Sequence, residues 1–215
     1  WEPDFKHVEA WLESLQPPKW RWSIDKGLAS KGEIIFREHC GRCHGSYGES
    51  DEYPEAVIPI DEIGTDRVRF DALTNVERNA LNESWFGHFG RDAVTIGDRQ
   101  RPEGYVAPPL DGVWASAPYF HNGSVPTLWH VLHPENRPPV WCRTPVGYDI
   151  HKVGLEIQER SAADFAEAVS GGMPSSLRRQ FFDTTKPGKS AEGHVYPEVL
   201  SDFERTAVLE YLKTL

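Results

Sequence analysis

The sequence predicts a mainly α-helical domain with long, loop-rich insertions. Gly32, Phe36 and Cys40 recur at intervals of four residues, which puts them on one face of a helix. The chain ends in a second segment with helical character, residues 201–215, which opens with a good N-cap residue. The chain is poor in aliphatic runs but contains 8 Trp, 17 Pro and 18 Gly, so we expect irregular connections and a core completed by a bulky bound group.

The most specific motif is Cys40-Gly41-Arg42-Cys43-His44, which reads C-x-x-C-H, the attachment signature of a c-type haem. The two thiols would each bond a haem vinyl group, and His44 would supply one axial nitrogen to the iron. A redox-active cysteine pair would want a βαβ context, and a zinc site would need two more ligands at short spacing. The motif therefore predicts a cytochrome c-like helical core around one covalently bound haem c.

Composition narrows the setting of this haem. The formal net charge is −10 and the pI is about 5.4, which argues against nucleic acid and against an anionic membrane surface as partners. No apolar run reaches the roughly 18 residues of a membrane span. Haem is attached covalently outside the cytoplasm, so we expect a periplasmic or otherwise extracytoplasmic protein whose leader was removed, or a haem domain of a longer protein. The third cysteine, Cys142, is expected to be an unpaired, partly buried thiol.

Four helices are predicted near the ends of the chain and in its first insert. Residues Asp4–Leu15 form an amphipathic helix that Pro17-Pro18 ends, after which Trp20 and Trp22 cover a neighbouring surface. Residues 25–40 form the next helix. Residues 66–85 form short helices, with Thr74 or Asn75 capping Val76–Leu81. The last helix begins at Ser201, where Glu204 completes a capping box.

The helix that leads into C-x-x-C-H resembles the N-terminal helix of class I cytochromes c. In that family the glycine at the position of Gly32 lets the last helix cross closely, and the aromatic residue at the position of Phe36 packs at the crossing. Val208 and Tyr211 lie three residues apart and resemble the matching half. The resemblance implies one monohaem domain over residues 1–215.

The middle of the chain is expected to be irregular. Residues 45–66 and 85–104 read as loops, and Ser124 is predicted to cap a short helix with Leu128, Val131 and Leu132 on its buried face. Residues 133–182 are predicted as a proline-rich loop followed by short helices at Ser161–Ser170 and Ser175–Phe182. His130 and His133 are expected to face solvent or to cap the end of a helix.

One stretch carries a second resemblance. Ala117-Pro118-Tyr119-Phe120-His121-Asn122-Gly123 resembles the hallmark segment in the C-terminal haem domain of bacterial dihaem cytochrome c peroxidases and their relatives, which include the rubber oxygenases. The resemblance to this family is strongest at residues 25–50, 105–132 and 182–215. The resemblance implies that His121 lies by the haem edge and that Tyr119 and Asn122 order its loop. Trp114 and Trp85 would line the haem crevice or pack in the core. The peroxidases need two haems, and this chain has one C-x-x-C-H.

The second axial ligand must come from the remaining histidines or the single methionine. The candidates are His7, His39, His88, His121, His130, His133, His151, His194 and Met173. His194 precedes the last helix by a few residues, where small cytochromes c place this ligand, and its loop resembles one in rubber-oxygenase-like domains that supplies a histidine. Gly193 would let the backbone approach the haem ring. Met173, His121 and an open site are the alternatives.

Two functions follow from these alternatives. A haem held by His44 and His194 would have no vacant site, which indicates electron transfer to a redox partner protein or an attached enzyme domain. An electron-transfer module is thus expected rather than an enzyme. The second reading is a haem peroxidase or oxygenase, or its electron-relay half. His88 would be the acid–base group in a monohaem peroxidase. A purely structural haem is the third reading.

Overall fold

The protein has a mixed α/β fold, and the predicted mainly helical class is wrong. In the computed structural model, which describes residues 2–48, 52–72, 74–84 and 104–215, 44% is helical and 17% is strand. The strands form two small antiparallel sheets, one of two strands and one of three. The elements are α1 (Glu2–Glu13), α2 (Lys26–His39), α3 (Gly41–His44), β1 (Val57–Pro59), α4 (Ile60–Ile63), α5 (Val68–Ala72), α6 (Asn75–Glu83), β2 (Gly104–Val106), η2 (Val113–Ala115), α7 (Leu128–Leu132), η3 (Pro134–Asn136), β3 (Val140–Asp149), β4 (Gly154–Arg160), α8 (Ala162–Ser170), α9 (Ser175–Arg178), β5 (Phe181–Asp183), η4 (Tyr196–Val199) and α10 (Asp202–Leu212).

Helices α2 and α10 cross in close contact, as predicted. A Cβ atom added to Gly32 would lie 1.9 Å from the carbonyl oxygen of Ala207 and 3.0 Å from Cβ of Tyr211. The rings of Phe36 and Tyr211 pack 5.4 Å apart beside this contact. Glycine is therefore required at position 32 because the backbone of α10 occupies the space of any side chain.

The ends of these helices follow the predicted local signals. Asp25 caps α2 by accepting from the backbone N–H of Leu28 at 3.0 Å. Ser201 and Glu204 form the expected capping box at the start of α10. Thr74 likewise accepts from the N–H of Glu77 in front of α6. Local capping rules thus located the starts of α10 and α6 correctly, while the cap at Asp25 was not predicted.

The start of α7 differs from the prediction. Thr127, and not Ser124, is its N-cap and accepts a hydrogen bond from the N–H of His130. Residues before Thr127 are extended, because Val125 bridges to Tyr119 and Thr127 bridges to Gly154. These tertiary bridges override the serine's capping preference and delay the helix by three residues.

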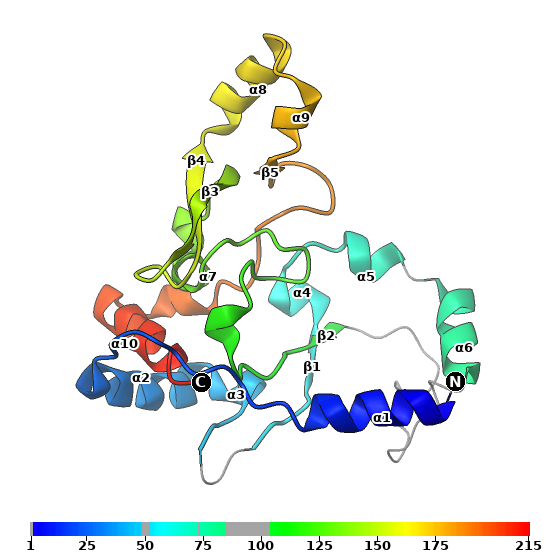
Figure 1. Cartoon of the computed structure of the whole chain (residues 1–215), viewed down its shortest axis with the longest axis vertical. Coiled ribbons are helices and arrows are strands. Elements are labelled where there is room, and N and C mark those ends of the chain that lie inside the picture. Colours follow the sequence, from blue (N-terminus) through cyan, green and yellow to red (C-terminus); the bar gives the residue numbers. More distant parts are fainter. Residues whose placement is uncertain (1, 49–51, 73, 85–103) are drawn as a thin grey trace.

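Residues 140–183, called the outer unit below, project away from the rest of the chain (Figure 1). Strand β3 pairs with β4 on one side and with β5 on the other, with Cys142 opposite both Gln158 and Phe181. The predicted loop and the predicted helix end at Phe182 are therefore wrong here. Helix α8 (capped by Ser161 and ended by Gly171) is as predicted, and it covers a small core of Val140, Phe165 and Phe181.

The remainder, called the body below, holds the larger core. Its buried members come from α2, from η2 to α7, and from α10, and the hairpin turn of the outer unit joins it through Val153. Trp20 and Trp22 cover this core as predicted: Trp20 lies 5.3 Å from Trp114, and Trp22 stacks on Tyr148 at 5.6 Å. None of the helices in the described part of the chain combines the length and apolar character that a membrane crossing needs.

Candidate haem site

The C-x-x-C-H motif forms the turn between α2 and the end of α3. Cys40 closes α2, since its N–H donates to the carbonyl of Phe36, and Cys43 and His44 follow within the single turn of α3. Both thiols are free and half-buried. The helical turn therefore presents the two sulfur atoms and the imidazole from one short segment.

The His44 ring is held from behind. Its Nδ1 lies 3.1 Å from the carbonyl oxygen of Pro108, so this nitrogen carries the proton and donates to it. The hydroxyl of Tyr47 donates to the carbonyl of His44 and accepts from the N–H of Leu110 at 2.7 Å. The hydrogen bond from Nδ1 to this carbonyl fixes the ring and leaves Nε2 as the nitrogen that can bind a metal.

The environment of the cysteines does not resemble that of a reactive thiol pair. Burial, and secondarily Cys43, raises the pKa of Cys40 to about 11. Redox-active and metal-binding cysteines have lowered pKa values. No cluster of three or more His, Cys, Asp or Glu side chains suited to a metal ion occurs within the described residues. The two alternatives to haem attachment therefore gain no support here.

His194 lies opposite His44. The centres of the two rings are 6.3 Å apart, and their planes are rotated by 66°. An imidazole nitrogen binds a transition metal at about 2.0–2.1 Å, and its ring centre lies about 1.1 Å further, so two imidazoles on one ion place their ring centres about 6.4 Å apart. The observed separation of the ring centres is close to this value.

The backbone of His194 is left-handed, with φ of 48°. This conformation is costly for a residue with a side chain and persists only where neighbouring structure imposes it. The N–H of His194 donates to the carbonyl of Ile63 at 2.7 Å. Gly193 touches Gly64, because an added Cβ would lie 2.3 Å from the Gly64 carbonyl carbon. The glycine therefore serves the close approach of two backbones, and its approach to a haem ring stays a prediction.

Two buried imidazole nitrogens mark the space near these rings. Within the described residues, Nδ1 of His194 and Nε2 of His121 are buried without hydrogen-bond partners. Such groups are rare in native structures and indicate a bound group, ion or water. Burial, then His44 and Arg137, lowers the pKa of His194 to about 4, so its ring is neutral and able to bind a metal. These residues fit a haem held between His44 and His194.

The hallmark segment lies on one side of this space. His121 packs against Tyr105 at 5.2 Å, and burial, which is its largest influence, lowers its pKa. Phe120 lies 5.9 Å from His194. Asn122 orders the loop by donating to the carbonyl of Ser190 and accepting from the N–H of Ser124, and the hydroxyl of Tyr119 donates to the carbonyl of Val113. The ordering roles of Tyr119 and Asn122 match the expectation, while a haem contact by His121 stays a prediction.

Other predicted residues lie elsewhere. The indole N–H of Trp114 donates to the carbonyl of Pro18, which turns this ring toward the aromatic cluster around Trp20. Met173 packs against the small core of the outer unit, away from His44. His130 is fully buried, against expectation, with Nδ1 2.7 Å from the hydroxyl of Thr127. His88 and Trp85 lie outside the described residues.

Two contributors were missed by sequence reasoning. Pro108 orients His44 through a carbonyl, and Arg137 holds the loop before His194 through carbonyls. Main-chain acceptors leave no pattern of residue types. The one available signal for Arg137 is an arginine enclosed by prolines, at Asn136-Arg137-Pro138-Pro139.

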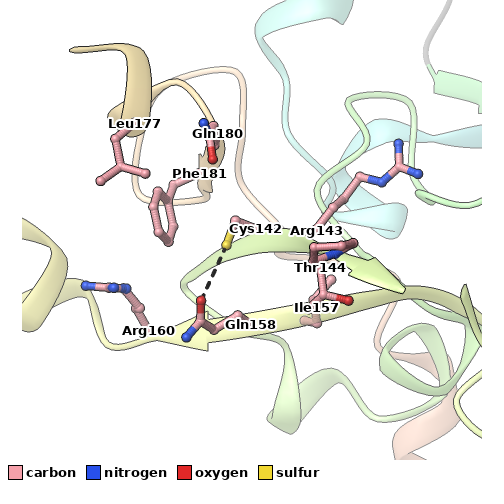
Figure 2. Close-up of a pocket in the computed structure, with 10 residues that line it drawn as sticks. Cys142, Arg143, Thr144, Ile157, Gln158, Arg160, Leu177, Gln180 and Phe181 are labelled. Atoms are coloured by element: carbon pink, nitrogen blue, oxygen red, sulfur yellow. Dashed lines mark hydrogen bonds between the residues drawn. The ribbon is translucent and has the colours of Figure 1, made fainter. Parts of the chain in front are cut away.

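A hollow of about 830 Å³ lies in the outer unit, with no predicted site residue in its lining. Figure 2 shows Cys142 facing Gln158 and Phe181, with Arg160 and Arg143 toward opposite ends. The sulfur of Cys142 lies 3.9 Å from Oε1 of Gln158. This hollow contains no histidine and does not compete with the site between His44 and His194.

Comparison with known proteins agrees with this site. A family model described as RoxA-like, cytochrome c-like matches residues 104–142, which include Pro108, the hallmark segment and Arg137. The chain is 31% identical to the uncharacterized protein y4iM of Sinorhizobium fredii over 87% of its own length and 45% of that protein. It is 27% identical to the uncharacterized protein y4iJ of the same organism, over 97% of its length and 43% of that protein.

The chain thus spans less than half the length of these relatives. The finer resemblances to class I cytochromes c and to dihaem peroxidases stay predictions. The matched segment is similar to a cytochrome c-like domain, a type of domain that implies haem c and haem-based electron transfer.

Proposed function

We propose that this chain transfers electrons through a single covalently attached haem c, with His44 and His194 as the two axial ligands. The observation that carries the proposal is the 6.3 Å separation of the two ring centres, one ring following the C-x-x-C-H cysteines and the other held in a left-handed conformation. We further propose that the protein works in the periplasm or another extracytoplasmic space, where c-type haem is attached.

The haem, when bound, supplies a reversible one-electron change at iron. The protein holds both imidazoles in place, so that little of the structure moves when the iron gains or loses an electron. His44 is fixed by Pro108 at Nδ1, and the backbone of His194 is fixed by Ile63. With both axial positions filled by protein nitrogens, no position remains for a substrate. This favours electron transfer over peroxide or oxygen chemistry on this haem.

The partner is proposed to be a redox protein or an enzyme domain of the same polypeptide. The relatives y4iM and y4iJ are more than twice as long as the matched parts, which supports the second form. In that form this chain would be the electron-relay part of a larger haem oxidoreductase. A full-length protein whose turnover stops when only this haem is removed would establish the relay role.

Covalent attachment and ligation are tested on protein produced in the periplasm together with the cytochrome c maturation machinery. We expect the intact mass to exceed the sequence mass by one haem, and acid–acetone to leave the haem on the polypeptide. The ferric spectrum should be low-spin without the far-red band of sulfur ligation. Extractable haem would contradict attachment at Cys40 and Cys43. Prompt stoichiometric carbon monoxide binding by the ferrous protein would contradict two protein ligands.

A further inference from the structure

Arg137 makes an unusual set of contacts beside His194. Its guanidinium donates to five backbone carbonyls: those of His130 (3.0 Å), Val131 (3.3 Å), Ala191 (2.7 Å), Gly193 (2.6 Å) and His194 (3.2 Å). Its plane also lies over the ring of Phe120, at 4.8 Å from the ring centre. Arg137 thereby joins three segments: α7, the hallmark segment and the loop before α10.

The contacts of Arg137 are made to the main chain and not to an acid. Among the described residues it forms no ion pair. Burial lowers its pKa to about 10, with Glu135 and Glu198 opposing, and it is charged at neutral pH. A half-buried cation with no carboxylate in contact is costly unless its donors are satisfied. Here the planar fork matches carbonyls that converge on it, and bonds from a charged donor are stronger than neutral ones.

Three of the five acceptors lie in residues 191–194. The left-handed backbone of His194 is therefore held on one side by Arg137 and on the other by Ile63, through its N–H, with Gly193 against Gly64. A strained residue persists when surrounding structure determines it from several sides. Without the guanidinium, the carbonyls of Ala191, Gly193 and His194 would lose a hydrogen-bond donor on the side facing α7.

We propose that Arg137 is the positioning residue of the distal ligand: it fixes the 191–194 backbone so that the His194 ring stays over the haem iron. The inference rests on the proposed ligation by His44 and His194. Arg137 itself does not touch the ring nitrogens of His194, and its action is exerted through the main chain.

The test uses the haem-loaded full chain and the rate at which its ferrous form binds carbon monoxide, which requires His194 to leave the iron. We expect Arg137→Gln to raise this rate about tenfold or more and to add a high-spin fraction to the ferric spectrum. Arg137→Lys keeps the charge but lacks the planar five-donor fork, so it should also raise the rate. It is the milder variant if Arg137→Gln yields little haem protein.

Arg205 provides the matched control. It is buried, donates through Nε to the carbonyls of Pro197 and Leu200, and pairs with Glu135 at 2.6 Å, and in the described part of the chain it has no hydrogen bond to residues 191–194. Arg205→Gln should lower the free energy of unfolding without changing the carbon monoxide rate. An equal rise in this control would show that Arg137 acts only through general stability and would overturn the inference.

If both Arg137 variants bind carbon monoxide at the parent rate, the positioning role is overturned. It is also overturned if Arg137→Lys binds at the parent rate while Arg137→Gln does not, because the effect would then depend on charge alone. A third variant, His194→Ala, distinguishes failure of this inference from failure of the proposed function. If His194→Ala gives a high-spin ferric haem while the Arg137 variants behave like the parent, ligation stands and the positioning role falls. If His194→Ala stays low-spin, both fall together.

Discussion

The body and the outer unit are stabilised in different ways. Among the described residues, twelve buried side chains of the body, from segments as distant as Phe36 and Leu212, form its core together with Val153 of the outer unit, whereas three form the core of the outer unit. Residues 140–183 carry five Lys or Arg and six Asp or Glu, a net charge of −1, so −9 of the chain's −10 belongs to the rest. The body thus combines the core, most of the negative charge and the histidine pair, while the outer unit is a sheet with a thin helical cover.

This difference locates the functions. A deep core can hold strained residues such as His194 in place, because many contacts oppose their relaxation. The outer unit, whose core has three buried residues, contains one histidine, His151, and therefore no histidine pair. We therefore expect changes to the body to alter haem ligation and changes to the outer unit to leave it intact.

The largest expected effect separates two candidate iron ligands. His194→Ala should open the iron to water, giving a high-spin ferric spectrum and rapid carbon monoxide binding after reduction. Met173→Ala, in the small core of the outer unit, should leave the spectrum unchanged. Optical and electron paramagnetic resonance spectra of the two variants check this. The opposite pattern would show that Met173, in the outer unit, is the iron ligand, and would contradict the assignment of haem ligation to the body.

A substitution at the helix crossing should have the next largest effect. Gly32→Leu places a side chain in the space of the α10 backbone, because its Cβ would lie 1.9 Å from the carbonyl oxygen of Ala207. We therefore expect a loss of about 3 kcal/mol in the free energy of unfolding. Gly27→Ala on the same helix meets only the Asp25 side chain at 3.4 Å and serves as the control. Denaturant melts of both variants measure the difference. Equal midpoints would mean that the crossing does not limit the stability of the body.

The junction between the units should respond to pH through His130. It is fully buried on α7, and its Nε2 lies 3.6 Å from Oε1 of Glu159 on β4. Burial, and then Lys152, His133 and Arg137, lowers its pKa to about 3, with Asp149 opposing. The unfolded chain binds a proton below pH ~6.5 and the folded chain does so only near pH ~3, so stability falls as pH drops through this window.

Between pH 7 and pH 5 this loss amounts to about 2 kcal/mol in the free energy of unfolding. Denaturant melts at the two pH values measure it. The variant His130→Gln removes the titrating group and should flatten the dependence. A wild-type stability that is flat over this range would show that the junction admits a charged imidazole.

The smallest expected effect concerns docking to a redox partner. Because the negative charge lies mainly on the body, association with a basic partner should slow as ionic strength rises, while the dissociation rate changes little. Stopped-flow electron transfer at low and high salt measures this. A flat rate would point to an apolar docking surface instead.

The two units also differ in how far the sequence predicted them. Ser201 with Glu204 acts over a few residues and Gly32 acts through a helix face, and each was recognised. Strand β3 contains Pro145 and Gly147, which favour loops, and its partner β5 lies about forty residues away. Nothing local marks such a pairing, which is why a loop was predicted.

The same reasoning applies to the candidate site. C-x-x-C-H and the hallmark segment were visible as residue types at fixed spacing, and they led to His44 and His121. His194 was chosen for its place in the loop before the last helix and for the resemblance of that loop. The carbonyl of Pro108 and the five carbonyls around Arg137 are properties of folded main chain, which residue types do not encode. The burial of His130 depended in turn on strands that had not been predicted.

The contacts of Arg137 have a consequence for how this loop can evolve. Every amino acid has a carbonyl group, so a guanidinium that binds Ala191 and Gly193 through theirs imposes no choice of side chain at the exposed Glu192 between them. Substitutions there can accumulate under selection for a new partner while the residue that faces the iron keeps its place. The surface of this loop can therefore change between related proteins while the metal ligand is retained.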